Sequence, residues 1–291
     1  MPKISYLLLT MIRPSDIPHL LQLLDDNSSI VQTQIREAFQ SFGEELEQEI
    51  FPYILPLSPK QRSLLEDLCT QIRKQEFHAH WLDWLEIQDE RQALESGLSW
   101  LSYHNKEFGA PALSPSLDQL AEEFKDRYPI QTIPRLMNFL FVEKGFSAPR
   151  DEYYHPDNSN LIHVLLNREG LQISLASLAI LLGQRLGLEL YGFNMPGHFM
   201  IVSAGDRGPR IYDPFNKGKA LPTQTMSFLD RSLQQQHTSI SELRAKTHEI
   251  ILRVLHNLIN VFTRKKETDE VAYYESLVKQ LARELKTRER K

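Results

Sequence analysis

The residues whose types and spacing most clearly suggest chemistry are His198 and Asp213, in the stretch MPGHFMIVSAGDRGPRIYDPFNKG. His198 follows a Pro-Gly pair, and Asp213 stands directly before Pro214. The residues between them read as two strands joined by a hairpin, with DRG as its turn. A His at the start of one strand and an Asp at the end of the next match the His and Asp of a catalytic triad. The pattern therefore raises the question of where a nucleophile lies.

The elements that must position this pair are a buried helix and a small sheet. The run ISLASLAILLGQRLG is apolar on nearly all sides, which predicts a helix in the centre of a domain. The runs LELYGFNM, HFMIVSA and PRIYDPF are the best strand candidates. A shorter helix, NLIHVLLNREG, comes before the central one; Asn158 or Asn160 is expected to cap it and Gly170 to end it. The run TIPRLMNFLFVEKGF predicts one further helix ending at Gly145.

The flanks of this region are predicted to be helical. Residues 20–43 resemble one HEAT-type helical hairpin, and a further helix is expected after Ser58 as N-cap and Pro59. Beyond Pro222, two long amphipathic helices with a break near residues 266–269 resemble a single TPR-type unit. The predicted fold class is α+β and mostly helical. We expect an N-terminal helical region at 1–95, a core at 96–235 and a C-terminal hairpin at 236–291.

A series of motifs in one order carries a family resemblance. LFVEKGF, NSNLIHVLLNREGLQIS, LGL, PGHF and DPFNKG, between Leu136 and Leu221, resemble the bacterial SirB-type invasion-regulator family of the transglutaminase-like superfamily. The resemblance implies a papain-like core, in which a central helix packs on an antiparallel sheet. It implies that residues 175–186 form that helix, and that His198 and Asp213 hold the family's His and Asp positions.

The nucleophile is the point at which the sequence departs from the superfamily. Active members place a cysteine at the start of the central helix, where the helix terminus and a His lower the thiol pKa. The window from Arg168 to Ser177 holds no cysteine, and the family position falls between Gln172 and Ser174. Ser174 supports two interpretations: an N-cap of the helix, or the nucleophile of a Ser174–His198–Asp213 triad.

Three other residues bear on this question. His198 and Asp213 have a structural alternative as well, in which a hydrogen bond between them ties two strands together. Cys69 is the single cysteine of the chain, and it lies on an apolar helical stripe. We therefore expect it to be a core residue outside the site.

Composition excludes several function classes. The chain has 291 residues and a net charge of −5, which favours neither nucleic acid nor an anionic membrane as a partner. No apolar run is long enough to span a membrane, and a single cysteine fits a reducing compartment, so we expect a cytoplasmic protein. No metal or cofactor site is expected.

Two functions follow as hypotheses. The first is a regulatory protein without catalysis that binds a protein partner through its helical flanks, with a peptide or small molecule in the cleft at His198. The second is an acyl hydrolase or peptidase that uses Ser174, His198 and Asp213.

Overall fold

The computed structural model describes residues 13–43, 46–195, 197–203, 208–235 and 243–290. The predicted hairpin turn at Asp206 and Arg207, and Pro196 before His198, lie outside these residues. The chain divides into two compact units, Met1–Trp81 with Lys106–Ala112, and Leu82–Asn105 with Leu113–Lys291. The predicted division into three regions at residues 95 and 235 is finer than these two units and stays a prediction.

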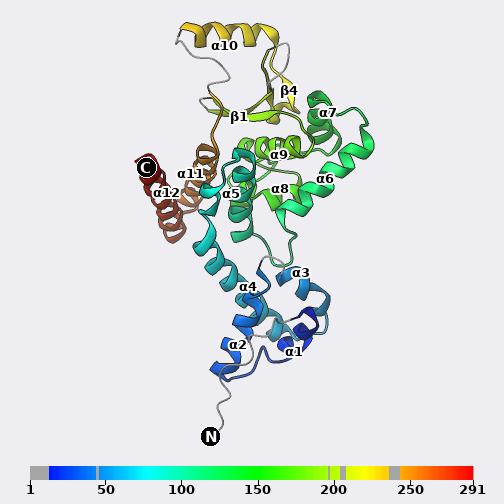
Figure 1. The fold of residues 1–291 in the computed structure, drawn as a ribbon, viewed down its shortest axis with the longest axis vertical. Helices are drawn as coiled ribbons and strands as arrows, with labels where there is room; N and C mark the ends of the chain where they lie inside the picture. The colour runs from blue at the N-terminus through cyan, green and yellow to red at the C-terminus, as the bar shows by residue number, and fades with distance from the viewer. Residues whose placement is uncertain (1–12, 44–45, 196, 204–207, 236–242, 291) are drawn as a thin grey trace. The chain divides into compact units, whose positions relative to one another are not determined.

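The first unit is a small helical assembly (Figure 1). Polar side chains join α2 (Ser29–Gln40) and α4 (Pro59–His80), since Arg36 donates to Gln71 at 2.8 Å and Gln40 to Gln75 at 2.7 Å. The Ser58 hydroxyl accepts from the backbone N–H of Gln61, so the predicted N-cap is confirmed. The helices are α1 (Ile17–Gln22), α2 (Ser29–Gln40), α3 (Leu46–Ile50) and α4 (Pro59–His80).

A buried charge network lies inside this unit. The carboxylate of Glu47 accepts hydrogen bonds from Lys106 Nζ and from the backbone N–H of Gly109, both at 2.7 Å, and from Arg73. All three charged residues are at least 93% buried, so the partners compensate one another away from solvent. Cys69 lies in the same core, as predicted, and burial raises the pKa of its thiol to about 12.

The second unit holds a four-stranded antiparallel sheet in the order β1-β2-β3-β4. Gly192 pairs with Ile201 and Ile201 with Tyr212, which fixes the register of the first three strands. The three predicted strands are confirmed, and β4 is an addition that the sequence did not indicate. The strands are β1 (Leu190–Met195), β2 (His198–Ser203), β3 (Arg210–Asp213) and β4 (Lys219–Ala220).

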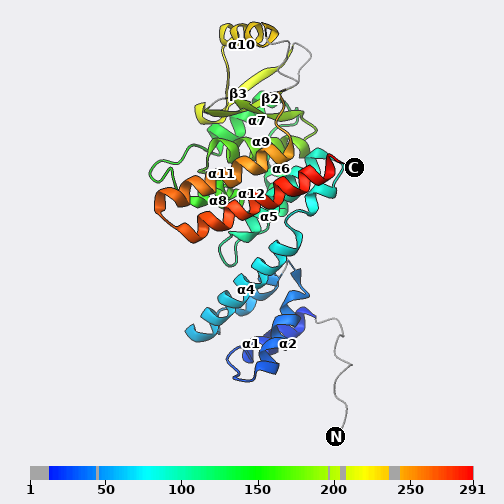
Figure 2. The same ribbon diagram turned by 90° about the vertical axis from the view of Figure 1, so that its left-hand side faces the viewer.

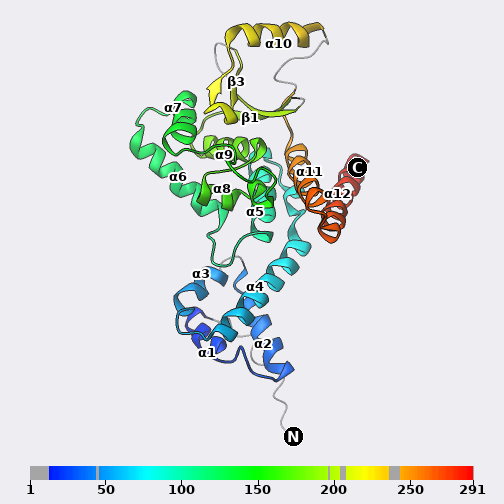
Figure 3. The ribbon, with the colours of Figure 1, turned by 180° about the vertical axis from the view of Figure 1, so that it is seen from behind.

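The helices of the second unit surround α9, which is apolar on nearly every side. Eleven of its residues are buried, and it contacts β1 and β2 as well as α5, α6, α7, α8 and α11 (Figures 1 and 3). The predicted central helix on an antiparallel sheet is therefore present. The helices are α5 (Glu90–His104), α6 (Leu113–Arg127), α7 (Ile133–Asn138), α8 (Leu161–Asn167), α9 (Gln172–Arg185), α10 (Thr223–Gln235), α11 (Thr247–Lys265) and α12 (Thr268–Arg288).

Helices α11 and α12 form an antiparallel hairpin that lies against α5 (Figure 2). Lys266 adopts a left-handed conformation, with φ of 61°, at the predicted break. The rings of Phe262 and Tyr274 stack with centroids 5.4 Å apart and hold the two helices together.

One predicted helix end is confirmed and one is wrong. The helix expected up to Gly145 runs as α7 and then as a π-helix at Phe139–Glu143, and Gly145 follows with a left-handed φ of 76°, so its predicted end is confirmed. Helix α8 ends at Asn167, because Arg168 rather than Gly170 takes the left-handed conformation. Gly170 instead lies against Val164, where a Cβ atom would approach within 2.7 Å. Over the described residues, no helix combines the length and apolarity needed to cross a bilayer.

Candidate functional site

The N-terminus of α9 is where the family resemblance implies a nucleophile. The helix starts at Gln172, after Leu171, and has no side-chain cap. Ser174 is its third residue and is 2% exposed, and its hydroxyl donates to the backbone oxygen of Asn158 at 2.8 Å. The same oxygen accepts from the N–H of Leu171, so it anchors the helix start from outside. The interpretation of Ser174 as the N-cap is therefore wrong.

Gln172 is the residue that meets His198. Its Nε2 lies 3.2 Å from Nδ1 of the imidazole, while its Oε1 accepts from the N–H of Phe199 at 3.4 Å. The second bond fixes the orientation of the amide, because only Oε1 can accept. Nε2 then donates to Nδ1, so the neutral ring carries its proton on Nε2.

His198 opens β2 directly after Gly197, whose φ is +78°. A side chain at position 197 would be strained in this conformation, so glycine allows the sharp turn that presents the exposed imidazole. The unprotonated ring nitrogen thus points at residue 172, where a nucleophile would need it as a base.

Asp213 ends β3, as predicted, and is half-buried. Its Oδ1 accepts from the N–H of Phe215 at 2.9 Å and caps the short 3-10 helix that follows. Within the described residues, neither a hydrogen bond nor an ion pair joins His198 to Asp213 or Ser174. The structure therefore joins Gln172 with His198 and leaves the other two predicted site residues in separate contacts.

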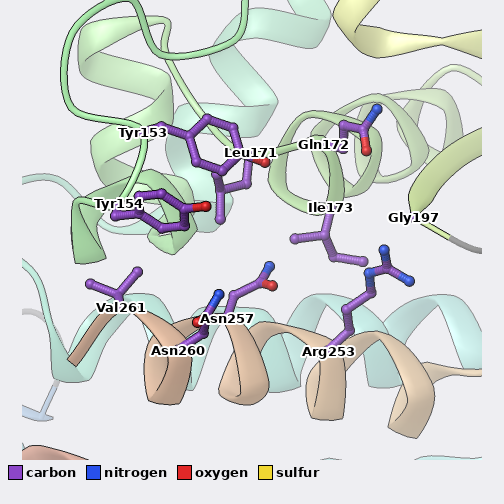
Figure 4. Close-up of a pocket in the computed structure, with 10 residues that line it drawn as sticks. All are labelled: Tyr153, Tyr154, Leu171, Gln172, Ile173, Gly197, Arg253, Asn257, Asn260 and Val261. Atoms are coloured by element: carbon purple, nitrogen blue, oxygen red, sulfur yellow. The ribbon is translucent and has the colours of Figure 1, made fainter. Parts of the chain in front are cut away.

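A polar pocket of about 240 Å³ lies beside this helix start (Figure 4). Four of its residues come from α11, and the three polar ones, Arg253, Asn257 and Asn260, point toward the start of α9. They recur at positions i, i+4 and i+7, the spacing of one helical face. The rest of the lining is Tyr153, Tyr154, Leu171, Gln172, Ile173, Gly197 and Val261.

The α11 wall of this pocket was not predicted from the sequence. The available signal was a polar stripe on a helix whose other faces are apolar. That signal is weak, because a polar stripe on an amphipathic helix most often faces solvent.

Asn158 connects the pocket's tyrosines to α9. Its Nδ2 donates to the backbone oxygens of Glu152 at 2.7 Å and Tyr153 at 3.1 Å. Its own backbone oxygen accepts from Leu171 and Ser174. This residue fixes the loop before α8 to the start of α9. Asn160, in turn, caps α8 by accepting from two backbone N–H groups, so the predicted cap is confirmed at that position.

The arrangement of helix, sheet and His agrees with comparison to known families. Residues 112–256 match the family model described as "Transglutaminase-like superfamily". The chain therefore contains a domain of the transglutaminase-like superfamily.

Individual relatives are similar to part of the chain. A protein of Xylella fastidiosa (strain 9a5c) named "UPF0162 protein" is 35% identical over 140 residues, which are 46% of this chain and 50% of the relative. A Vibrio cholerae protein of the same name is 35% identical over 82 residues, 28% of this chain and 30% of the relative. Human "F-box only protein 21" is 27% identical over 138 residues, 44% of this chain and 22% of the relative.

The matched stretch thus spans about half the length of the Xylella relative. No solved structure matches the chain.

Proposed function

We propose that this protein is a non-catalytic, SirB-type member of the superfamily that acts by binding. The observation that carries the proposal is the contact between Gln172 and His198 at the start of α9. A carboxamide nitrogen is a hydrogen-bond donor and a very poor nucleophile, because its lone pair is delocalised into the carbonyl. The imidazole therefore faces a group that it cannot activate.

The second support is the state of Ser174. Its hydroxyl proton is committed to the backbone oxygen of Asn158, and the residue is 2% exposed. A serine nucleophile needs its hydroxyl within hydrogen-bond reach of the base and open to the substrate. The alternative function, an acyl hydrolase or peptidase with Ser174, His198 and Asp213, requires this contact to break and the side chain to turn.

The helical parts of the chain suit a role in binding partners. α1 and α2 have the positions of the predicted HEAT-like hairpin, and α11 with α12 those of the predicted TPR-like unit. In repeat proteins, stacked hairpins of both kinds bind other proteins. We propose a protein partner for these helices, a cytoplasmic location, and a peptide or small molecule as the ligand of the pocket beside His198.

The test is a hydrolysis assay on the full chain and two variants, Ser174→Ala and His198→Ala. The substrates are p-nitrophenyl acetate for esters and a fluorogenic peptide anilide for amides. We expect all three proteins to give the same rate, equal to that of a Ser227→Ala control, whose hydroxyl lies on exposed α10. Turnover that both site variants abolish, and that the control retains, would establish the hydrolase instead.

A further inference from the structure

The pocket has the chemistry of a carboxylate site. We propose that the pocket between α9, α11 and Tyr153 binds the carboxylate of a short peptide segment, with Arg253 as its principal partner. This inference rests on the proposed binding role of the domain and names the ligand class.

Arg253 is a cation without an anionic partner among the described residues. Its guanidinium donates to the side-chain oxygen of Asn194 and lies 5.6 Å from the ring centre of Phe199. Both groups are neutral, and none of the residues that line the pocket is an Asp or Glu. Burial lowers the pKa of Arg253, yet an arginine keeps its charge, so the side chain holds a partly desolvated positive charge. Such a charge favours an anion.

The start of α9 adds donors to the same pocket. Among the described residues, no acceptor bonds the backbone N–H groups of Gln172 and Ile173, which are first-turn groups without a helical partner. The positive end of the helix dipole lies there as well. A carboxylate that pairs with Arg253 therefore also meets the favourable end of α9.

The remaining lining residues suit a peptide rather than a free ion. Asn257 and Asn260 each offer an amide donor and acceptor, the pairing that a peptide bond requires. Tyr153 and Tyr154 are exposed and lie edge to face at 5.1 Å, and Arg264 stacks on Tyr154 at 4.0 Å. A volume of about 240 Å³ accommodates one terminal residue or one acidic side chain, not a folded surface.

The experiment measures binding of three peptide probes to the full chain by saturation-transfer NMR and titration. N-acetyl-Gly-Gly carries a terminal carboxylate, N-acetyl-Glu-N-methylamide a side-chain carboxylate, and N-acetyl-Gly-Gly-amide none. We expect one or both acids to bind and the amide to bind about tenfold or more weakly, because charge-assisted hydrogen bonds are the strong ones. The acid that binds more tightly shows whether the site prefers a terminal carboxylate or a side-chain carboxylate.

The variants locate the site. Arg253→Gln should weaken binding of the acid peptides by about tenfold. Arg253→Lys should weaken it by less, because lysine keeps the charge without the bidentate geometry. Arg283→Gln, at an exposed position of α12, removes the same charge outside the pocket and should leave affinity unchanged. A melting curve for each variant, with Arg253→Lys as the milder change, separates loss of binding from loss of folding.

Several outcomes overturn the inference: equal binding of the acids and the amide, equal affinity of inorganic phosphate, or no effect of Arg253→Gln in a folded protein. Absence of binding together with absence of hydrolysis would refute the carboxylate site alone. Hydrolysis that depends on Ser174 would refute the proposed function.

Discussion

Gln172 donates from Nε2 to Nδ1 of His198 across 3.2 Å, and the two residues come from different elements, the first turn of α9 and the first residue of β2. The contact is therefore tertiary, and it forms only when the helix docks on the sheet. It places an amide in the window, Gln172 to Ser174, where the family resemblance implies a thiol.

A cysteine introduced at this position should become reactive. In Gln172→Cys the thiol would face the imidazole at a helix N-terminus, two influences that lower a thiol pKa. We expect alkylation by iodoacetamide at pH 6.5 to be about tenfold faster or more than in the Gln172→Cys/His198→Ala double variant. The wild-type chain supplies the background, since Cys69 is its single cysteine and is buried. Equal rates in the single and double variants would contradict an activating His198.

Removing the hydroxyl of Ser174 should destabilise the second unit. Ser174→Ala deletes a buried hydrogen bond and leaves the Asn158 oxygen with one partner, Leu171. We expect a loss of about 1 kcal/mol in the free energy of unfolding, measured by urea denaturation. Ser227→Ala removes a similar hydroxyl on an exposed surface and should lower the free energy of unfolding much less. An unchanged midpoint for Ser174→Ala would show that the serine does not hold the helix start.

Neutralising Glu47 should strongly destabilise the first unit. Glu47→Gln leaves the charges of Arg73 and Lys106 buried without their carboxylate. We expect the free energy of unfolding, measured by chemical denaturation, to fall by about 3 to 5 kcal/mol. Glu66→Gln, on an exposed position of α4, is the matched control and should stay within about 0.5 kcal/mol of the wild type. A small effect at Glu47 would indicate that solvent reaches the network.

Cys69 should make stability depend on pH in the alkaline range. Burial raises its pKa from 9.0 to about 12, so the folded state favours the neutral thiol. The stabilisation is complete below pH 9 and is lost as the pH rises toward 12. We expect the wild type to lose stability relative to Cys69→Ala across this window, as measured by denaturation at pH 8, 9 and 10. A stability difference independent of pH would show that the thiol is not desolvated.

The sequence predicted the elements that depend on local patterns. The apolar residues of α9, the β-rich runs of the strands, and Ser58 before Pro59 each carry their own signal, and the structure contains all three elements. The helix end at Gly145 was predicted correctly, because a glycine there takes the left-handed conformation. The end of α8 was wrong, because Gly170 serves close packing against Val164 while Arg168 takes the left-handed conformation that ends the helix.

The candidate site could be predicted only in part. His198 and Asp213 follow from strand ends, and the window Gln172–Ser174 follows from the resemblance. The choice within that window depends on the side to which each residue of the first turn points. Ser174 turns toward Asn158 and Gln172 toward His198, a difference fixed by the docking of α9 and not by residue type. The α11 wall comes from about eighty residues further along the chain, beyond the reach of any local pattern.

The position of that wall has a consequence for how the domain is isolated. The family match ends at residue 256, whereas the pocket also needs Asn257, Asn260 and Val261. A fragment that ends with the matched residues would stop in the middle of α11 and would lack three of the residues that line the pocket. The residues matched by the family model and the residues that line the pocket thus end at different positions, so a fragment that keeps the whole pocket must extend beyond residue 261.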